Sequence, residues 1–300
     1  MNGYRVTARS VSRAALALVI MSLVGCATPP RRALDPADRS PPGGREAVVL
    51  VSQGEIHAEI NASQVSAALG GGLLGALIDT SVNQHRTNKA EETIKPLRDA
   101  LGGYNFDQRA VEATRAALVG LDWLGARQVS FSKDVSSNNR IACLDKSQAP
   151  EVIFATYDYG LSADFAAMEV SVTVTIAPKA VPPGKAAKDR IDVGNAAYTQ
   201  EFTAVVPLAS AGTDLAANTQ LWVADGARLA RVALDSGLAR DTLLIQRGLS
   251  QTPQDAAKLG QGASVNEHGL VGKLIEKDAK GTLLVDPRGT WVYVAAIPIG

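Results

Sequence analysis

Cysteine and histidine are scarce in this chain, which contains two cysteines and three histidines among its 300 residues. Two cysteines cannot form a multi-disulfide framework or a four-cysteine zinc site. The histidines, His57, His85 and His268, do not occur in an H-E-x-x-H sequence, and no G-x-S-x-G nucleophile motif is present. The sequence therefore contains no local hydrolase motif and indicates no metal site. A hydrolase would have to be assembled by the fold from residues far apart in the chain.

Net charge is also absent, because 30 lysines and arginines balance 30 aspartates and glutamates. Such a balance creates no field that would attract phosphate backbones, which argues against nucleic acid as a partner. The composition, with 46% hydrophobic and 20% charged residues, is that of an ordinary globular protein. With 300 residues the chain is long enough for a buried core in one large domain or two small ones.

The N-terminal region lacks a hydrophobic run long enough to span a bilayer. Residues 14–24 are apolar apart from Ser22, and eleven residues cannot cross the ~30 Å hydrocarbon core as a helix. The run follows Arg5, Arg9 and Arg13, the only charged residues among the first 25. A basic segment followed by a short apolar segment is typical of a signal peptide, which is removed from the mature protein.

The sequence Leu23-Val24-Gly25-Cys26, at the end of this run, resembles the lipobox of bacterial lipoproteins. The resemblance covers residues 1–26 and implies that residues 1–25 are a signal peptide and that Cys26 is acylated. Because Ala27 rather than aspartate follows the cysteine, it also implies sorting to the outer membrane, with the domain facing the periplasm. Several acyl chains, palmitate among them, make a stable anchor where one chain binds only marginally. The alternative is a buried N-terminal helix that ends in Gly-Cys, but such a helix would show polar residues at helical spacing.

A lipidated Cys26 leaves Cys143 without a disulfide partner. The surrounding sequence, Ile141-Ala142-Cys143-Leu144, predicts a small buried apolar residue at this position. A reactive thiol would need a nearby histidine or a helix N-terminus, and the sequence indicates neither.

Residues 26–46 are interpreted as the lipidated cysteine followed by a proline-rich tether. Residues 27–46 contain five prolines and few aliphatic side chains, so they cannot bury enough apolar surface to fold. Proline favours an extended chain of ~3 Å per residue, which would let the domain stand up to roughly 60 Å from the bilayer. We therefore expect that removal of residues 33–44 leaves the stability of the domain almost unchanged.

The first part of the domain combines strand and helix patterns. Residues 47–52 are apolar and β-branched and residues 55–60 alternate, which predicts a strand or a hairpin around Gly54. Helical composition follows in three segments, of which the second is interrupted by Pro96 and the third begins with Asp107 as its N-cap. These segments are residues 64–84, residues 89–101 and the stretch from Asp107 through Leu121.

The middle of the chain predicts a three-stranded antiparallel meander. Residues 168–176 alternate strictly between apolar and polar side chains, so one face of this strand is core and the other is solvated. Residues 151–159 are its expected hairpin partner, and residues 196–206 alternate again after the Pro/Lys-rich loop 177–192.

Residues 214–248 form the longest helical stretch in the sequence. Gly226, Gly237 and Gly248 are eleven residues apart, so they share one face if the helix is continuous, and a break near Gly237 is the alternative. Basic and acidic residues alternate along the stretch and predict a solvated face with charge pairs. They are Arg228, Arg231, Arg240 and Arg247, interleaved with Asp225, Asp235 and Asp241.

The C-terminal residues predict a second β unit, with strands at residues 270–277, 282–285 and 290–297. Asp286-Pro287-Arg288-Gly289 has the residue types of a type I turn between the last two strands. The fold class that follows is α+β, with helices packed on a mostly antiparallel sheet of two meander-like units. The globular domain covers residues 47–300, and a subdivision is considered at the loop 177–192.

The sequence Gly70-Gly71-Gly72-Leu73-Leu74-Gly75 matches the dinucleotide fingerprint G-x-G-x-x-G, but its context does not. No strand runs directly into it and no βαβ alternation follows, so we expect no cofactor. Gly71 and Gly75 instead have the spacing that lets two helices touch, within an apolar patch over residues 67–78 that resembles the glycine zippers of some envelope proteins. Twelve residues are too few to span a membrane, which leaves internal helix packing, oligomerisation or shallow membrane insertion as interpretations.

Glu55, His57 and Glu59 alternate along one expected strand, which would place three metal-binding side chains on one face about 7 Å apart. A solvated polar face opposite Ile56 and Ala58 explains the same pattern more simply. We therefore expect no metal at these residues.

From these patterns we expect a membrane-anchored interaction or structural component of the bacterial envelope, with a protein or a second copy as its partner. The apolar helical region at residues 70–78 is the surface to test first. A periplasmic hydrolase without a local motif stays open as an alternative, as does a carrier of lipids or small molecules, which would need a hollow between sheet and helices.

Overall fold

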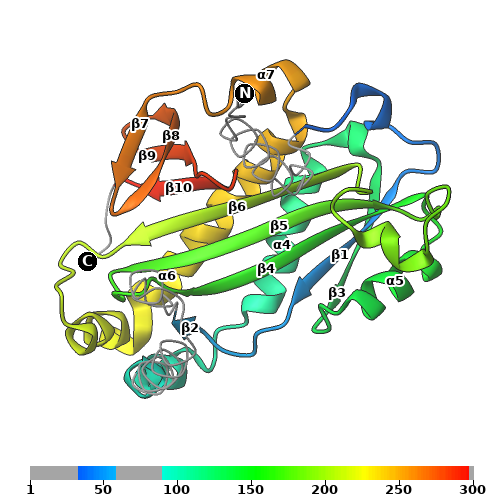
Figure 1. The fold of residues 1–300 in the computed structure, drawn as a ribbon. Coiled ribbons are helices and arrows are strands. Elements are labelled where there is room, and N and C mark those ends of the chain that lie inside the picture. Colours follow the sequence, from blue (N-terminus) through cyan, green and yellow to red (C-terminus); the bar gives the residue numbers. More distant parts are fainter. Residues whose placement is uncertain (1–32, 59–89, 297–300) are drawn as a thin grey trace, which may run out of the picture.

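The computed structural model describes residues 33–58 and 90–296. These residues form an α+β fold with one ten-stranded, mostly antiparallel sheet, which confirms the expected fold class (Figure 1). Along the sheet the strands follow the order β3-β1-β4-β5-β6-β10-β9-β8-β7, with β2 beside β4. Their bounds are β1 Arg45–Val51, β2 His57–Ala58, β3 Ala126–Ser132, β4 Glu151–Leu161, β5 Ala167–Pro178, β6 Tyr198–Pro207, β7 Ser264–Glu267, β8 Leu270–Lys277, β9 Gly281–Val285 and β10 Trp291–Ala295.

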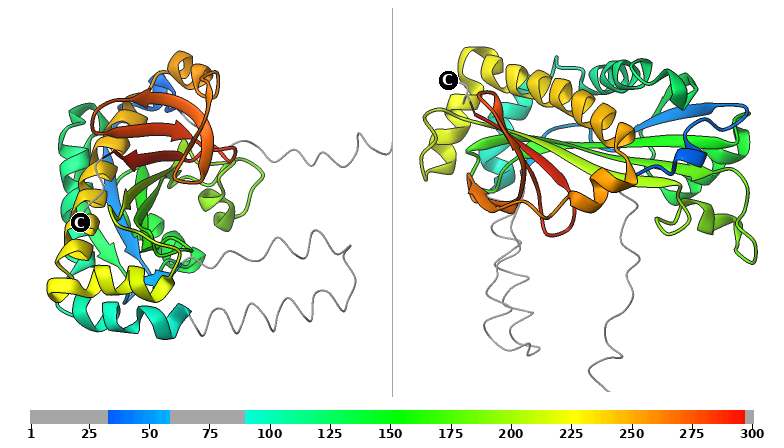
Figure 2. Two further views of the ribbon diagram at one scale, coloured as in Figure 1. Left: turned by 90° about the vertical axis from the view of Figure 1, so that its left-hand side faces the viewer. Right: turned by 90° about the horizontal axis from the view of Figure 1, so that it is seen from above.

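Strands β4, β5 and β6 form the expected antiparallel meander. The ladder between β4 and β5 runs from Glu151↔Pro178 to Leu161↔Met168, and β6 continues it on the other side of β5. Their apolar side chains point to the face on which α4 (Phe106–Val119) and α6 (Leu215–Ser250) lie side by side (Figure 2). The main core, with Val170, Val172 and Val174 of β5 at its centre, fills this interface.

On the opposite face of the sheet, the described residues form apolar clusters at its two ends. At one end α5 (Ser137–Lys146) packs Leu144 on Val48, Leu50 and Phe154. At the other end Val205 of β6 packs with apolar side chains of the last two strands, Leu284, Val292 and Val294. The stretch between these clusters carries the polar residues of β4, β5 and β6, as the alternation predicted.

Of the strand or hairpin expected around Gly54, residues 45–58 show the strand, β1, and no hairpin. Both β1 and β2 pair in parallel with β4, β1 along residues 151–157 and β2 at Gly160 and Leu161, so the two strands run in the same direction. Gly54 thus lies in the irregular stretch between β1 and β2, which pair with successive parts of the same strand, β4. β3, which the sequence did not indicate, extends the sheet beyond β1 and is also parallel to it.

Of the three expected helical segments, the second and the third are confirmed with different boundaries, and the first, residues 64–84, lies outside the described residues. Residues 90–101 form one helix that continues past Pro96, so the expected interruption is wrong. The helix α4 is capped by Asn105, whose side chain accepts a hydrogen bond from the backbone N–H of Gln108, and Asp107 lies in its first turn. The short helices α5 and α7 (Pro253–Lys258) were not expected. Three short 3-10 turns are also present, η1 Pro36–Asp38, η2 Asp122–Leu124 and η3 Ala187–Ile191.

The helix α6 is interrupted at Asp225–Ala227 rather than near Gly237. Asp225, Gly226 and Ala227 have left-handed backbone angles, with φ values of 53°, 66° and 61°. Gly237 and Gly248 lie on the face against the sheet: a methyl group on Gly237 would come within 2.6 Å of Val170, and one on Gly248 would overlap the ring of Phe202. Two of the three spaced glycines therefore permit close helix packing, and Gly226 belongs to the break.

The C-terminal β unit is confirmed, with β7 as an additional short strand before it. β8, β9 and β10 are antiparallel, and β10 joins β6 in parallel at Trp291↔Phe202, so the two expected units form one continuous sheet. The loop 177–192 connects β5 and β6, which pair with each other along their length. The structure thus shows no boundary between two units at this loop.

Part of the expected tether packs on the domain. The side chain of Leu34 is fully buried in the main core. Arg39 stacks over the ring of Trp123 and donates a hydrogen bond of 3.1 Å to the carbonyl of Gln251. The expectation that residues 33–44 bury almost nothing is therefore wrong. The proposed signal peptide, Cys26 and the pair Gly71 and Gly75 lie outside the described residues.

Candidate functional site

Hollows at two places in the described structure are large enough to hold a ligand or a peptide segment. One place is the polar face of β4, β5 and β6, where two hollows adjoin each other, and the other is the C-terminal end of α6. Within residues 33–58 and 90–296, no helix is both long and apolar enough to cross a membrane. In the same ranges no three His, Cys, Asp or Glu side chains gather in a way that could hold a metal ion.

The first hollow, which we call the sheet groove, has a volume of about 490 Å³. Its floor is the polar face of the meander, and its wall is formed by the C-terminal strands, with Leu270, Val271 and Leu284. Every second residue of β4, β5 and β6 points to this face, so the floor carries the hydroxyl and carboxyl groups of these residues. The floor residues are Thr156, Asp158, Glu169, Ser171, Thr173, Glu201 and Thr203.

Hydrogen bonds between strands order these floor side chains. Ser171 and Thr203 share a hydrogen bond of 2.9 Å between their hydroxyl groups, and the hydroxyl of Thr290 donates to Glu201 at 3.0 Å. Asp286 accepts from the backbone N–H of Arg288 and of Thr290, which ties down the turn at the edge of the groove. The floor is therefore preorganised for polar contacts.

An adjoining hollow of about 590 Å³ shares Glu169 and Val205 with the sheet groove. It contains Asp164 and His268, the latter exposed in the turn between β7 and β8 with a left-handed φ of 51°. Together the two hollows carry the carboxyl groups of Asp158, Asp164, Glu169, Glu201 and Asp286 against the single guanidinium of Arg288. The combined surface is acidic and would favour a partner with positive charge.

The described residues do not place Glu55 and His57 on one strand, as the sequence predicts for Glu55, His57 and Glu59. Glu55 precedes β2 and pairs with Arg98 at 3.6 Å, and Glu59 lies outside the described residues. His57 turns toward Asp158, with 3.7 Å between Nε2 and Oδ2, and its Nδ1 contacts the amide of Gln53. The structure therefore separates Glu55 from His57.

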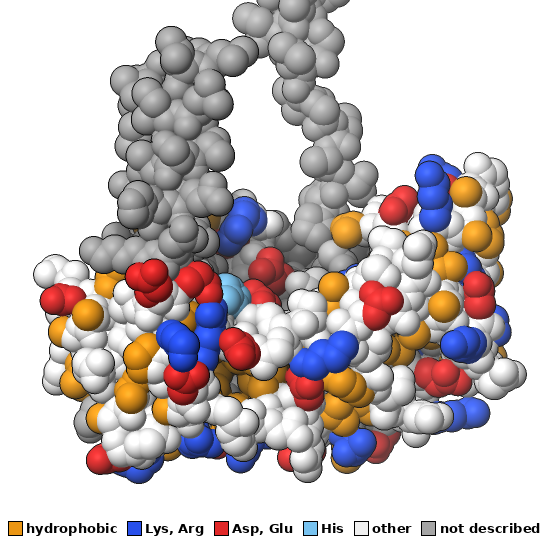
Figure 3. All heavy atoms as spheres, turned by 90° about the horizontal axis from the view of Figure 1, so that it is seen from below, with side chains coloured by type: hydrophobic (Ala, Val, Ile, Leu, Met, Phe, Trp, Pro, Cys, Tyr) orange, Lys and Arg blue, Asp and Glu red, His pale blue; other side chains and the backbone are white. Residues whose placement is uncertain are grey.

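Charge is interspersed on the surface of the domain. On the face that Figure 3 shows, acidic and basic side chains alternate with scattered apolar ones. Of the charge pairs expected along α6, Arg228 and Asp225 lie 4.0 Å apart. Two other charges of α6 pair with different elements: Arg247 with Glu276 of β8 at 2.5 Å, and Asp235 with Arg109 of α4 at 2.6 Å. Such mixed charge produces no strong field of one sign over this face.

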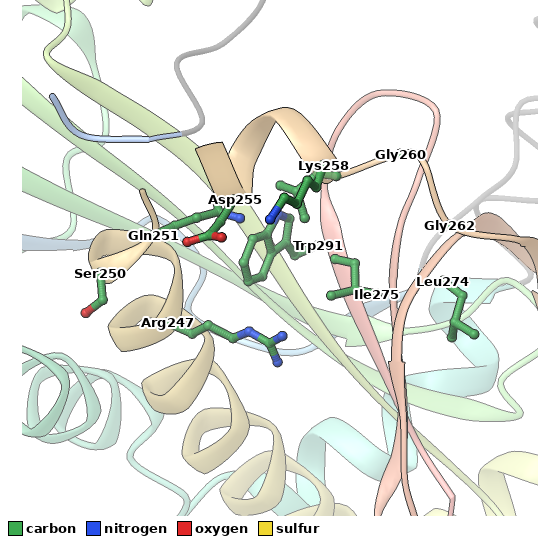
Figure 4. A pocket seen from close by; sticks show the side chains of 11 residues that line it. Arg247, Ser250, Gln251, Asp255, Lys258, Gly260, Gly262, Leu274, Ile275 and Trp291 are labelled. Atoms are coloured by element: carbon green, nitrogen blue, oxygen red, sulfur yellow. The ribbon is translucent and has the colours of Figure 1, made fainter. Parts of the chain in front are cut away.

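The second hollow, which we call the helix-end pocket, has a volume of about 560 Å³. It lies between the end of α6, the short helix α7 and the strands β8 and β10 (Figure 4). Leu259, Leu274 and Ile275 supply apolar surface, and the polar residues come from the helices and from β10. These polar residues are Arg247, Ser250, Gln251, Asp255, Lys258 and Trp291.

Asp241 is the charged residue of α6 that sequence reasoning misplaced. It was assigned to a solvated face, yet its side chain is fully buried and neither carboxyl oxygen has a hydrogen-bond partner among the described residues. Burial raises the pKa of this carboxyl well above its usual value. Asp241 follows Gly237 by four residues and precedes Gly248 by seven, a spacing that would have placed it on the sheet-facing side.

Cys143 is half-buried, and its thiol is free. Burial foremost raises the pKa of this thiol, so it is less ionised than an ordinary cysteine at neutral pH. It packs against the cluster formed by α5 and β1. This environment favours a packing role over a reactive one.

The described residues assemble no histidine-based nucleophile. Neither His57 nor His268 is hydrogen-bonded to a serine, threonine or cysteine side chain in this part of the chain. Burial raises the pKa of Tyr159 to about 12, so its phenol is protonated at neutral pH. The geometry of the described residues offers surfaces for hydrogen bonding and charge pairing.

Comparisons of the chain with protein-family models, with characterised proteins and with solved structures gave no match. Function is therefore argued from the site and from the N-terminal sequence alone.

Proposed function

We propose that this protein is a lipid-anchored lipoprotein of the bacterial envelope, held in the outer membrane by acyl chains on Cys26 and facing the periplasm. In this proposal the domain is an interaction or structural component that binds a protein partner in the sheet groove. The lipobox over residues 23–26 supports the anchor, and the sheet groove supports the binding role.

The packing of Leu34 and Arg39 on the domain makes the proposed tether short. If the free segment is residues 27–33, an extended chain of ~3 Å per residue spans roughly 20 Å, about a third of the reach expected from the whole proline-rich stretch. The domain would then stay close to its membrane, with the end of α6, which Arg39 contacts, near the attachment point. A partner in the same membrane or next to it would be within reach.

The polar stretch of β4, β5 and β6, which no described helix covers, is the observation that carries the binding role. Its hydroxyl and carboxyl groups accept hydrogen bonds, and its carboxyl groups outnumber the basic groups beside them. A peptide segment with lysine or arginine side chains matches this surface. A standard interface needs roughly 800 Å² per partner, so the groove would form the centre of a larger contact.

The alternatives receive less support from the described residues. A carrier of the kind considered above would need a hollow between sheet and helices, where Val170, Val172 and Trp222 belong to the buried core. A hydrolase would need an activated nucleophile, and neither described histidine contacts one. Saturable turnover of a substrate by the purified protein would favour the hydrolase, and extraction of lipid by the purified protein would favour the carrier.

Photocrosslinking in living cells tests the groove. A photoreactive phenylalanine analogue replaces Thr173 in the groove, and the control position is Glu112, which is exposed on α4 on the opposite face. We expect a discrete adduct of higher mass from position 173 and none from position 112. Asp158→Lys, which reverses a charge in the groove, should weaken the adduct. Equal labelling at both positions, or no adduct at 173, would exclude the groove as the partner site.

Self-association through Gly71 and Gly75 is a separate part of the proposal. Leucine at position 75 would force apart two helices that touch there, at a cost of ~1–3 kcal/mol for overpacking. Gly75→Leu should therefore shift the sedimentation of an oligomer toward the monomer, or lower the melting temperature if the contact is internal. Unchanged sedimentation and melting would show that these glycines hold no helix contact.

A further inference from the structure

We propose that the helix-end pocket binds a small ligand with a free carboxylate, an amide N–H and an apolar side chain, as at the C-terminus of a peptide. The pocket is distinct from the sheet groove, and its lining shares no residue with it. This inference does not rest on the lipid anchor or on the partner of the groove.

Two buried polar groups in the pocket wall have no partner. Trp291 is 1% exposed and Gln251 is 9% exposed, and neither Trp291 Nε1 nor Gln251 Oε1 has a hydrogen-bond partner within the described ranges. By contrast, Nε1 of the equally buried Trp222 donates to the carbonyl of Phe165 at 2.8 Å. Buried donors and acceptors are nearly always satisfied, so an unpaired donor beside an unpaired acceptor in one pocket indicates a missing ligand group.

These groups converge on the same space. In Figure 4 the side chains of Gln251, Asp255 and Lys258 extend from the end of α6 and from α7 toward the indole of Trp291 on β10. A ligand between them can accept a hydrogen bond from Trp291 and donate one to Gln251. An amide or carboxylic acid group provides both functions within a few atoms.

Lys258 is the cation of the pocket that is best placed to hold a carboxylate. The guanidinium of Arg247 pairs with Glu276 at 2.5 Å, and the carboxylate of Asp255 accepts a hydrogen bond from the hydroxyl of Thr252 at 2.7 Å. This hydrogen bond and, to a smaller extent, the charge of Lys258 lower the pKa of the Asp255 carboxyl, but Lys258 itself has no ion pair within 4.0 Å among the described residues. The Lys258 ammonium can therefore contact one ligand carboxylate, and the Asp255 carboxylate beside it disfavours a phosphate dianion.

The remaining wall is apolar and suits an aliphatic side chain. Leu259, Leu274 and Ile275 line the side of the pocket opposite the end of α6, and a volume of about 560 Å³ lies within the range of small-ligand sites. Carboxylate, amide N–H and aliphatic group together describe the last one or two residues of a peptide. Recognition of such a terminus by a cation and fixed donors is a known mode of peptide binding.

The NMR resonances of the indole N–H groups of the three tryptophans provide a direct test with the purified full chain in detergent micelles. The probes are N-acetyl-leucyl-leucine with a free carboxylate and the same dipeptide as its C-terminal amide. We expect the free acid to shift the Nε1–H resonance of Trp291 saturably, with a dissociation constant on the order of 0.1 mM. The resonance of Trp222, already hydrogen-bonded to Phe165, should not move and serves as the internal control.

Variants and the second probe assign the contacts. Lys258→Ala should weaken binding of the acid about tenfold, and the amide should bind wild type as weakly as the acid binds the variant. Trp291→Phe identifies the resonance because the variant loses it, whereas Lys188→Ala, an exposed lysine elsewhere, should bind like wild type. If the Trp291 resonance does not move up to 10 mM acid, or if acid and amide bind equally, the carboxylate site is excluded.

Discussion

Asp241 of α6 lies near Tyr157 of β4 in the buried interface between helix and sheet. Burial foremost raises the pKa of the Tyr157 phenol; its hydrogen bond with Thr114 acts against this, and the charge of Asp241 adds to it. No charged group contributes to the shift of Asp241 itself, which burial alone causes. Burial in the packed face of α6 therefore favours the protonated, neutral form of this carboxyl group.

The first prediction concerns pH. Because the folded pKa of Asp241 lies above the unfolded value of about 3.8, the folded state keeps a proton that the unfolded chain releases. The contribution of Asp241 to stability is fully present below pH ~4 and is lost as pH rises toward its folded pKa, at ~1.4 kcal/mol for each pH unit. Asp241→Asn should unfold in urea at higher concentration than wild type at pH 7 and at nearly the same concentration at pH 4.

Asp235→Asn is the matched control on the same helix. Asp235 is half-exposed and pairs with Arg109. This variant should show no gain at pH 7. An Asp241→Asn protein whose stability differs from wild type by the same amount at both pH values would contradict the assignment of a buried neutral acid.

The second prediction tests the close contact of α6 with the sheet. A methyl group on Gly248 would overlap the ring of Phe202 and lie 2.9 Å from the hydroxyl of Tyr198. We expect Gly248→Ala to lower the free energy of unfolding by ~1–3 kcal/mol, although alanine has the higher helix propensity. The measurement is chemical denaturation. A variant more stable than wild type would show that α6 does not pack on Phe202 as described.

The third prediction isolates the left-handed break of α6. Gly226 has a φ of 66° and nothing within 4 Å of the position of a Cβ atom, so Gly226→Ala meets only the backbone cost of ~1–2 kcal/mol. Gly194 is equally open but has no left-handed φ, and Gly194→Ala should be neutral or slightly stabilising. Equal melting temperatures for the two variants would mean that α6 is continuous in solution.

The fourth prediction concerns the segment before β1. Leu34 is fully buried, so Leu34→Ala should cost ~2–4 kcal/mol of stability, whereas Pro42→Ala in the same segment removes an exposed side chain and should cost little. Arg45 strengthens this attachment by donating hydrogen bonds to the backbone carbonyls of Asp38 and Arg39. A Leu34→Ala protein as stable as wild type would restore the interpretation of residues 33–44 as a free tether.

Strands with one solvated face were predictable because their pattern is local. Residues 168–176 alternate strictly, and β5 follows them within two residues at either end. β3 was not predictable, since this edge strand has no buried residue and its sequence therefore shows no apolar face. The parallel contact of β10 with β6 joins residues about 90 positions apart, and such pairing depends on the whole fold rather than on either segment.

The candidate sites were only partly visible in the sequence. The polar positions of β5, such as Glu169, Ser171 and Thr173, were expected to be solvated, and they form the floor of the sheet groove. The wall from β8 and the convergence of Gln251 with Trp291 arise from contacts between distant segments, which no local spacing indicates. The charge of Asp241 favours a solvated position, whereas its spacing of four residues from Gly237 places it on the sheet-facing side of α6, where the structure has it.

Acylation of Cys26 tests the central claim most directly. Cells that express the full chain are labelled with an alkyne analogue of palmitate, and the N-terminal peptide of the purified protein is analysed by mass spectrometry. The account predicts a label on wild type and on Cys143→Ala, a mature N-terminus at Cys26 with several acyl chains, and no label on Cys26→Ala, which should leave the membrane fraction. Retention of residues 1–25, or a Cys26→Ala protein that is labelled and sediments with membranes like wild type, would contradict the claim.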